Sequence, residues 1–478
     1  MSENPIREVD RRLIPILFGT YMLNFMDKSI LSSASVFGLI DDTHLVGQQY
    51  SWVSSIFYFG YFAWEMPTNL LIPRVPVAKY LTINTIFWGI VVTLTAVCVD
   101  VHGLLTLRFL LGVAEATITP AFMFITTTWY TREEIPIRTA IWFSGNSIGG
   151  LLGSLLAYAL GHITSPLHPW QWMYLILGIA TTLWALVIFV FLPDCISSAR
   201  FLTPSQRSLM TQRVLVAGTG RTEETHWSWS QTTECLRDPK TPILLALSLL
   251  TQIPNGGVQN FSNLVLTSFG FSPLQTALLN IPTSLISTAA ITLSGWIAGR
   301  VRHTLCLLIG IVAMVSVTGS ALVYSRENLA PGVQLLGYFL LATGPATLPL
   351  TMTLVQANYR GVTKKMTMTG LMFVVYCVGN IAGPHLFRAR EAPVYQTSFR
   401  AILVCYLLVV ALAALLRVYL TLVNRTRDRV EGIGGAVEDA QDANNKTQSV
   451  NQVMEIQLRE QDYEDRTDWE IVRFRYRL

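Results

Sequence analysis

The chain has 478 residues, of which 51% are hydrophobic and only 13% are charged, and its formal net charge is +4. Soluble domains carry about 25% charged residues, so this composition excludes an ordinary soluble protein and indicates that lipid is the solvent. The six cysteines are scattered over apolar segments and one polar connection, so they predict neither a disulfide framework nor a metal site.

Long apolar blocks follow one another along the chain, and each is close to the roughly 20 residues that cross a bilayer as a helix. Twelve blocks are predicted to span the membrane: 13–37, 51–72, 80–99, 103–129, 138–161, 172–192, 243–268, 274–298, 304–324, 333–355, 367–388 and 399–422. The polar segment 1–12 lacks the pattern of a cleavable signal, so the first block is expected to remain as a span.

Basic residues concentrate on alternate connections, as they do on the cytoplasmic side of membrane proteins. They precede the first block and follow the second, fourth, eighth and tenth: Arg7, Arg11, Arg12, Arg74, Lys79, Arg132, Arg138, Arg300, Arg302, Arg360, Lys364 and Lys365. The connections 38–50, 162–171 and 269–273 contain neither Lys nor Arg, which places them outside. Arg326, Arg388 and Arg390 are exceptions to this pattern. We therefore expect an integral, multi-pass protein with both termini in the cytoplasm.

A polar linker at 193–242 divides the blocks into two six-helix bundles, 13–192 and 243–422. Within it, Thr203 as N-cap and Pro204 at the first helical position predict a short surface helix. The polar segment 423–478 is expected to be a cytoplasmic tail, disordered between 432 and 450. The predicted fold is thus an all-α polytopic membrane protein with twelve transmembrane helices in two halves, the arrangement that a rocking transporter requires.

Ionisable side chains inside the predicted helices gather in the first half: Asp27, Lys28, Glu65, Arg108 and Glu115. A charge at the bilayer centre costs about 2.5 to 3.5 kcal/mol, so such residues usually face a cavity and one another. Arg108 and Glu115 are seven positions apart, which puts both on one helix face about 10 Å apart. We hypothesise that the basic groups bind an anion while the carboxylates carry a proton. The alternative is that these charges pair only to fix helix packing, and for Glu65 a structural or gating ion pair is an equal alternative.

The second half offers amides and hydroxyls instead of charges. Candidate substrate ligands there are Gln252, Gln259, Tyr376 and Asn380, although the same groups could form only interhelical hydrogen bonds. Pro254 and Asn255, followed by two glycines, predict a break in the seventh helix and a gate at that position. Asn146 lies among small residues of the fifth helix and is assigned a gating or structural role.

Several motifs resemble the anion:cation symporter family of the major facilitator superfamily, and within it the fungal allantoate permease branch. They are Asn24-Phe25-Met26-Asp27-Lys28-Ser29, the run from Arg108 to Ala116, Phe191-Leu192-Pro193-Asp194, Phe269-Gly270-Phe271-Ser272, the run from Gly379 to Pro384, and the tail runs 464–468 and 474–476. The resemblance extends over nearly the whole chain.

This resemblance implies alternating access with proton symport of organic anions such as carboxylates, ureido acids or vitamin-like acids. It assigns Asp27 and Glu115 to proton coupling, and Lys28 and Arg108 to the anion. It also places Tyr61 and Asn380 in the substrate cavity. Position 28 departs from the family pattern, because Lys stands where Arg is usual, and Lys offers a carboxylate a point charge instead of a bidentate fork. The basic loop at 74–79 is also a reduced form of the superfamily's motif.

Two other functions remain open on the same fold. A proton-coupled exporter of drugs or metabolites typically has a Gly-Pro kink in the fifth helix, but Gly150 stands where that proline is expected, which favours symport. A nutrient receptor without transport activity would be supported by a long signalling domain, and the linker and tail are short. No metalloprotease, nucleophile-elbow or Walker motif indicates an enzyme. The expected partners are a small organic anion, protons and the lipid bilayer, without cofactor, metal or nucleic acid, in a monomer of the plasma membrane more than of an internal one.

Overall fold

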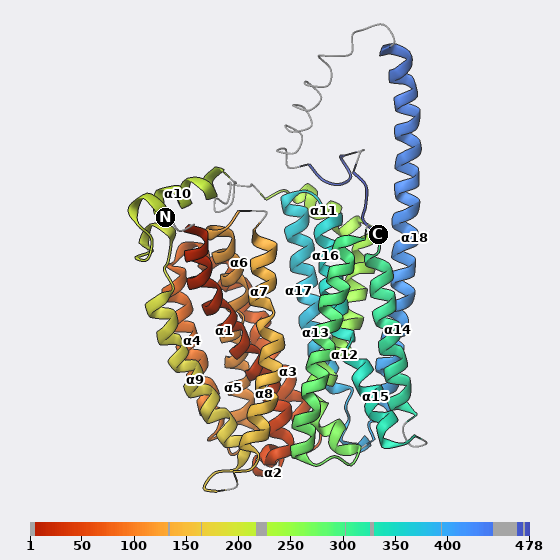
Figure 1. Cartoon of the computed structure of the whole chain (residues 1–478). Coiled ribbons are helices and arrows are strands. Elements are labelled where there is room, and N and C mark those ends of the chain that lie inside the picture. Colours follow the sequence, from red (N-terminus) through yellow and green to blue (C-terminus); the bar gives the residue numbers. More distant parts are fainter. Residues whose placement is uncertain are drawn as a thin grey trace.

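The computed structural model describes residues 5–478 except 132–133, 164, 217–226, 302, 326–328, 393, 443–465 and 472–473. In this part of the chain the regular elements are all helices, and they form two groups that stand side by side (Figure 1). The helices up to α9 make the first half and those from α12 onward make the second. The expected all-α fold with two six-helix halves is confirmed.

The first half and the linker contain α1 (Pro5–Ala34), the π-helical turn η1 (Ser35–Leu39), α2 (Ile40–Asp42), α3 (Gln49–Leu71), η2 (Ile72–Arg74), α4 (Val77–Thr95), α5 (Val101–Glu115), α6 (Ile118–Trp129), α7 (Ile135–Phe143), α8 (Gly145–Leu160), α9 (Pro169–Phe191), η3 (Ile196–Ser198) and α10 (Pro204–Val216). The start of α1 lies at one end of the bundle, which we name the termini end because residues 466–471 and 474–478 also lie there (Figure 1). The connections 43–48 and 269–272 lie at the opposite end.

The second half contains α11 (Trp229–Arg237), α12 (Lys240–Ser268), α13 (Pro273–Arg300), α14 (Leu305–Tyr324), α15 (Pro331–Leu341), η5 (Gly344–Ala346), α16 (Thr347–Asn358), α17 (Val362–His385), η6 (Ala389–Glu391) and α18 (Gln396–Asp442). In Figure 1, α18 extends well beyond its neighbours at the termini end. Disorder was expected from residue 432, but α18 continues as a helix through Asp442, and 443–450 lie outside the described residues.

Twelve helical segments of the described chain cross the bundle: α1, α3, α4, α5 with α6, α7 with α8, α9, α12, α13, α14, α15 with α16, α17 and α18. Nine of them, judged on the described residues, are long and apolar enough to span a membrane by length and composition alone. The other three are α1, α3 and α12. They carry most of the charged and amide side chains singled out in the sequence, which lowers their hydropathy.

Three predicted single helices are interrupted. The span predicted at 138–161 divides into α7 and α8 at Ser144, and proline explains the other two interruptions. The span predicted at 103–129 divides into α5 and α6 at Ala116 and Thr117. Pro120 has no amide hydrogen, so it cannot donate to the carbonyl of Ala116 four residues earlier. The span predicted at 333–355 divides into α15 and α16 around Pro345. Because of the interruption at Ala116 and Thr117, Glu115 is the last residue of α5, beside a turn in the middle of the half.

The linker is anchored by short capping contacts. The predicted helix at Thr203 and Pro204 is confirmed as α10, and the Gln206 Oε1 atom accepts a hydrogen bond from the Thr203 amide at 2.9 Å. Asp194, from the Phe-Leu-Pro-Asp motif, accepts hydrogen bonds from the amides of Ala78 and Lys79 at 3.0 and 3.3 Å. This carboxylate therefore lies at the positive N-terminus of α4, where it stabilises the helix.

Glycine lets α3 and α5 approach to backbone contact. A Cβ atom added at Gly112 would overlap the carbonyl oxygen of Phe57, and one added at Gly60 would overlap the carbonyl oxygen of Phe109. The two helices carry Tyr61 and Glu115, and both of these side chains lie beside Lys28. The position of each relative to Lys28 therefore depends on this contact.

Replacing Gly112 by alanine should therefore lower the free energy of unfolding by about 1–3 kcal/mol, since the overlapping atoms belong to a backbone that cannot rotate away. Thermal unfolding in detergent, followed by tryptophan fluorescence, measures the change. The matched control is Gly310→Ala on α14, where an added Cβ meets no atom within 4 Å. Equal midpoints for the two variants would contradict this account of the α3–α5 contact.

The described residues of the last segment, 466–471 and 474–478, bind back onto the helix ends of the second half. The Leu478 carbonyl accepts from the Leu305 amide at 2.8 Å, and Asn358 exchanges two hydrogen bonds with the Arg477 backbone at 2.7 and 2.9 Å. Asn424 of α18 exchanges two more with the Tyr476 backbone, both at 2.9 Å. This segment thus links α14, α16 and α18 at the termini end.

Beneath this segment lies a buried set of charges that we name the tail cluster: Glu234, Asp238, Lys240, Lys364 and Asp468. The Asp468 carboxylate receives Lys240 Nζ at 2.6 Å on one oxygen and Lys364 Nζ at 2.7 Å on the other. Lys364 and Lys240 are 0% and 1% exposed. Burial raises the pKa of Asp468, but the two ammonium groups more than offset it and hold that pKa below its usual value.

Candidate functional site

Hydrogen bonds between the two halves lie near the opposite end of the bundle in the described part of the chain. They are Ser32 to Ser262 at 2.8 Å, the Asn263 amide to Ser32 at 3.1 Å, Asn263 to Ser33 at 3.2 Å, Tyr50 to the Asn260 carbonyl at 2.8 Å, Ser51 to the Pro384 carbonyl at 3.0 Å and Ser55 to the Ile381 carbonyl at 2.8 Å. At the termini end, by contrast, Met66 and Leu70 of α3 and Met366 of α17 are more than half exposed. The halves are therefore closed against each other at the opposite end.

Lys28 and Glu115 form an ion pair in the middle of the first half. Lys28 Nζ lies 3.2 Å from Glu115 Oε2, and the Glu115 side chain is fully buried while that of Lys28 is 21% exposed. The same ammonium lies 5.5 Å from the ring centres of Phe57 and Tyr61 on α3. Aromatic faces attract cations at this range, so Lys28 is held between a carboxylate and two rings.

Asp27 lies on the buried side of α1, directly before Lys28. It is 1% exposed, and the indole of the buried Trp88 is the hydrogen-bond donor that faces its carboxylate. It lies within electrostatic range of Glu115, Arg108 and Lys28. A carboxylate that is buried this deeply beside a neutral donor is costly to ionise, so Asp27 is a group at which a proton can be held.

Arg108 is oriented by α9. Its Nη2 atom donates to the Tyr174 hydroxyl at 2.5 Å, while its Nε atom is buried without a hydrogen-bond partner among the described residues. Because α5 runs from the opposite end toward the termini end, Arg108 lies two turns closer to the opposite end than Glu115. The structure thus places the guanidinium beside Tyr174 and leaves one of its donors free.

Aromatic side chains of α3 and α17 meet across the boundary between the halves. The rings of Tyr61 and Phe373 are 5.6 Å apart, and those of Tyr58 and Tyr376 are 6.0 Å apart. Tyr61 also lies beside Lys28. The predicted ligands Tyr61 and Tyr376 are therefore joined in one aromatic group that borders the ion pair.

Three amide side chains of the second half form a hydrogen-bonded group. Asn380 Nδ2 donates to Gln252 Oε1 at 3.1 Å, and Asn255 Nδ2 donates to Asn380 Oδ1 at 3.1 Å. Gln252 and Asn380 are almost fully buried, whereas Asn255 is partly exposed. Gln259 lies one turn further along α12, partly buried and outside this group.

The predicted break in the seventh helix is wrong. α12 runs without interruption from Lys240 to Ser268 with Pro254 inside it. Transmembrane helices tolerate an internal proline because neighbouring groups satisfy the freed backbone. The glycines that suggested a break serve contact instead, since a Cβ atom at Gly256 would lie 2.7 Å from the Asn380 Cα and one at Gly257 would lie 2.7 Å from the Phe387 ring.

The two remaining predicted gating residues lie apart from these groups. Glu65 is near the termini end of α3, where Asn69 donates to its Oε1 atom at 3.5 Å and its Oε2 atom has no hydrogen-bond partner among the described residues. Asn146 is partly exposed near the start of α8. Neither joins the ion pair or the amide group.

The chain belongs to the Major Facilitator Superfamily, whose family model matches residues 17–384. It is therefore a membrane transporter and not an enzyme.

Relatives and solved structures agree with this assignment. An uncharacterized transporter of Schizosaccharomyces pombe is 34% identical over 88% of this chain and 80% of its own length. The allantoate permease of Saccharomyces cerevisiae is 30% identical over 98% of this chain and 86% of its own length. A bacterial homologue of the human lysosomal transporter Spinster, in an inward-facing and unoccupied conformation, shares the fold with a TM-score of 0.66 and 16% identity over 87% of this chain and 97% of that one. The resemblance to the fungal allantoate permease branch is thus confirmed.

Proposed function

We propose that the protein is a proton-coupled symporter of a small organic anion that works by alternating access, as a monomer in the plasma membrane with its termini end in the cytoplasm. The observation that carries this proposal is the Lys28–Glu115 ion pair, which lies in the middle of the helices with Lys28 Nζ 3.2 Å from Glu115 Oε2. An ion pair at this depth is costly to build, which favours a role in transport over a role in packing.

The ion pair offers a direct route to coupling. When Glu115 takes up a proton, Lys28 loses its negative partner and its ammonium becomes available to a substrate carboxylate. When the proton leaves, Glu115 competes again for Lys28 and weakens the hold on the substrate. Proton and anion therefore bind together and are released together, which is the requirement of symport. Asp27 is the second site at which a proton can be held.

The substrate is placed between the halves by groups on both sides. Lys28 supplies the charge from α1, Arg108 adds a free donor from α5, and the aromatic group borders the site at Tyr61 and Tyr376. The amide group around Asn380 supplies donors and acceptors from α12 and α17 without adding charge. Lys28 is a point charge, so it binds a carboxylate without the fixed geometry of an arginine.

Alternating access is supported by the closure at one end. Among the residues described, Ser51, Ser55 and Tyr50 join the halves by hydrogen bonds near the opposite end, while apolar side chains of α3 and α17 are uncovered at the termini end. This is the pattern of a carrier that is open on the side of its termini. The basic connections at that end favour the cytoplasm.

An uptake assay in proteoliposomes tests the proposal. Allantoate, nicotinate and acetate are offered outside with the pH lower outside than inside, and then without a pH difference. The name of the allantoate permease relative and the charge of Lys28 make a carboxylate the first class to test. We expect at least one acid to accumulate only with the inward proton gradient. Extrusion of preloaded acid by that gradient would instead identify an exporter, and no movement of any acid would refute an organic anion substrate.

A further inference from the structure

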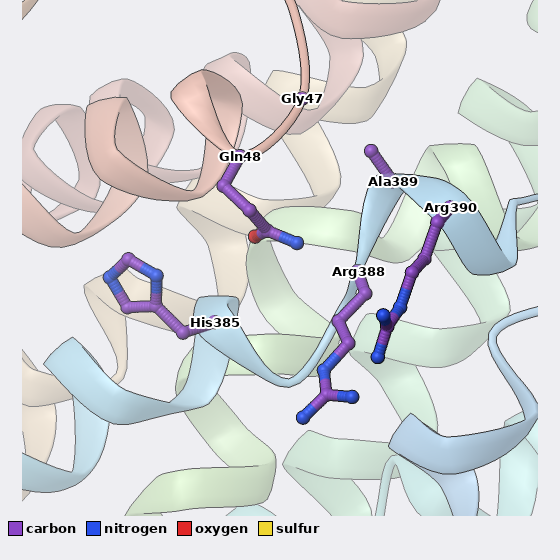
Figure 2. A pocket seen from close by; sticks show the side chains of 6 residues that line it. All are labelled: Gly47, Gln48, His385, Arg388, Ala389 and Arg390. Atoms are coloured by element: carbon purple, nitrogen blue, oxygen red, sulfur yellow. The ribbon is translucent and has the colours of Figure 1, made fainter.

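A cavity lies at the opposite end, away from the Lys28–Glu115 pair. It has a volume of about 440 Å³ and is lined by Gly47, Gln48, His385, Arg388, Ala389 and Arg390 (Figure 2). Gly47 and Gln48 belong to the first half and the other four belong to the second, so the cavity bridges the boundary between them. Its volume is in the range of sites that bind small molecules.

The cavity has a cationic wall. Figure 2 shows the Arg388 and Arg390 side chains extending alongside each other from the segment after α17. Both are exposed, and in the described part of the chain neither forms an ion pair with a carboxylate. The neighbouring Glu391 carboxylate instead accepts the Thr397 amide at 3.0 Å, at the start of α18. The two guanidinium groups are thus available to an anion.

The first half adds to this positive wall. Gly47 and Gln48 directly precede α3, so the partial positive charge of that helix N-terminus faces the cavity. The Gln48 side chain makes no capping bond, and its Oε1 atom has no hydrogen-bond partner among the described residues. Figure 2 shows this amide between His385 and Arg388. An amide of this kind can turn its NH₂ group toward a bound anion.

The position of the two arginines runs against membrane topology. Basic residues are depleted from short connections on the outer side, and Arg388 and Arg390 are exceptions to the pattern that orients this chain. Retaining two such residues on one short segment, on the wall of a cavity, favours a role in binding.

The cavity also adjoins the closure between the halves. The Trp52 and His385 rings are 4.7 Å apart across the boundary between the halves. Next to them in the chain, Ser51 donates to the Pro384 carbonyl. α3 and α17 then lead from these residues to the aromatic group, in which Tyr61 lies beside Lys28. When the halves separate at this end, the cavity opens onto the path to the central site.

We propose that this cavity is an outer recruitment site, in which Arg388 and Arg390 bind the carboxylate of the incoming substrate before the halves open toward it. The inference rests on the proposed function, because it requires an anionic substrate. Clefts lined by one sign of charge raise the local concentration and association rate of opposite charges, and salt screens this effect. The site should therefore lower KM at low ionic strength without changing the maximal rate.

The test compares Arg388→Gln/Arg390→Gln with Arg237→Gln/Arg300→Gln, which removes the same charge from exposed positions at the termini end. Uptake of radiolabelled allantoate, nicotinate and acetate is measured in phosphatidylcholine vesicles at low and high salt. We expect the first variant to raise KM about tenfold at low salt, to keep the maximal rate and to lose most of its salt dependence. The control variant should retain the wild-type KM.

The outcomes separate this inference from the proposed function. If the wild type transports at least one of the acids and the Arg388→Gln/Arg390→Gln variant keeps the wild-type KM at low salt, the recruitment site is refuted and symport stands. If the wild type transports none of the acids, both proposals fall. An effect of the variant that arises only when phosphatidylglycerol is added to the vesicles would show that the arginines bind lipid phosphate, and this too would refute recruitment of the substrate.

Discussion

Replacing Glu115 by glutamine should abolish uptake driven by a proton gradient while leaving exchange of substrate across the membrane at least partly intact. Glutamine keeps the shape of the side chain and an acceptor for Lys28, but it can neither gain nor lose a proton. Lys28 then stays available to the anion at every pH. The measurement compares accumulation under an inward proton gradient with counterflow of labelled against unlabelled substrate in the same vesicles.

Asp27→Asn is expected to give the same separation if Asp27 also carries the proton. Glu134→Gln is the matched control, because Glu134 pairs with Arg213 at 2.6 Å outside the membrane-spanning helices. Its uptake and counterflow should both resemble the wild type. Accumulation at the wild-type level in the Glu115→Gln variant would remove Glu115 from the coupling mechanism, and loss of counterflow together with accumulation would point to damage of the fold or the anion site.

Replacing Asp468 by asparagine should lower the free energy of unfolding by about 3–5 kcal/mol. The change leaves Lys240 and Lys364 buried with less negative charge than before, and breaking a buried pair by removing one partner is strongly destabilising. Thermal unfolding in detergent, read from tryptophan fluorescence, measures the loss. Asp428→Asn is the matched control, because Asp428 pairs with Arg475 of the same segment at 2.6 Å but is mostly exposed. An exposed pair contributes about 0–1 kcal/mol.

The effect of Asp468→Asn should not vary between pH 5 and pH 8. The pKa of Asp468 is lower in the folded protein than its ordinary value, so its stabilisation is present above that ordinary value, near 4, and is lost as the pH falls through the folded value. Equal midpoints for the Asp468 and Asp428 variants, or a difference that disappears between pH 8 and pH 5, would refute the buried ionic role of Asp468.

The architecture follows from the sequence because the bilayer imposes one simple condition, a run of apolar residues about 20 long. That condition located the twelve spans, and the polar break between them located the linker. Capping chemistry is equally local, so Thr203 and Pro204 predicted α10 correctly. The same local reading failed at Pro254 and the glycines after it. A glycine pair that allows a helix to bend and one that allows a second helix to approach look alike in a sequence.

The tail cluster was not predicted, since its partners are far apart in the chain. Lys364 was counted among basic residues of a cytoplasmic connection, but it is fully buried against Asp468, which is 104 residues away by their numbers. The motif around Asp468 was noticed only as a resemblance. The aromatic group was missed for another reason: Tyr58 and Phe373 lie in spans rich in apolar residues, where nothing local separates a ring facing another helix from a ring facing lipid.

The closure between the halves has a consequence for the energy of the transport cycle. Its contacts are hydroxyl and amide hydrogen bonds from Ser32, Tyr50, Ser51, Ser55 and Asn263. Polar bonds between membrane helices are worth about 0.6 kcal/mol each. If the protein works by the alternating access proposed above, opening this end breaks contacts worth only a few kcal/mol, a difference at which a minor state is typically populated at about 0.1–10%. A ligand that binds the open form of this end some hundredfold more tightly would then be enough to make that form comparable in population to the closed one.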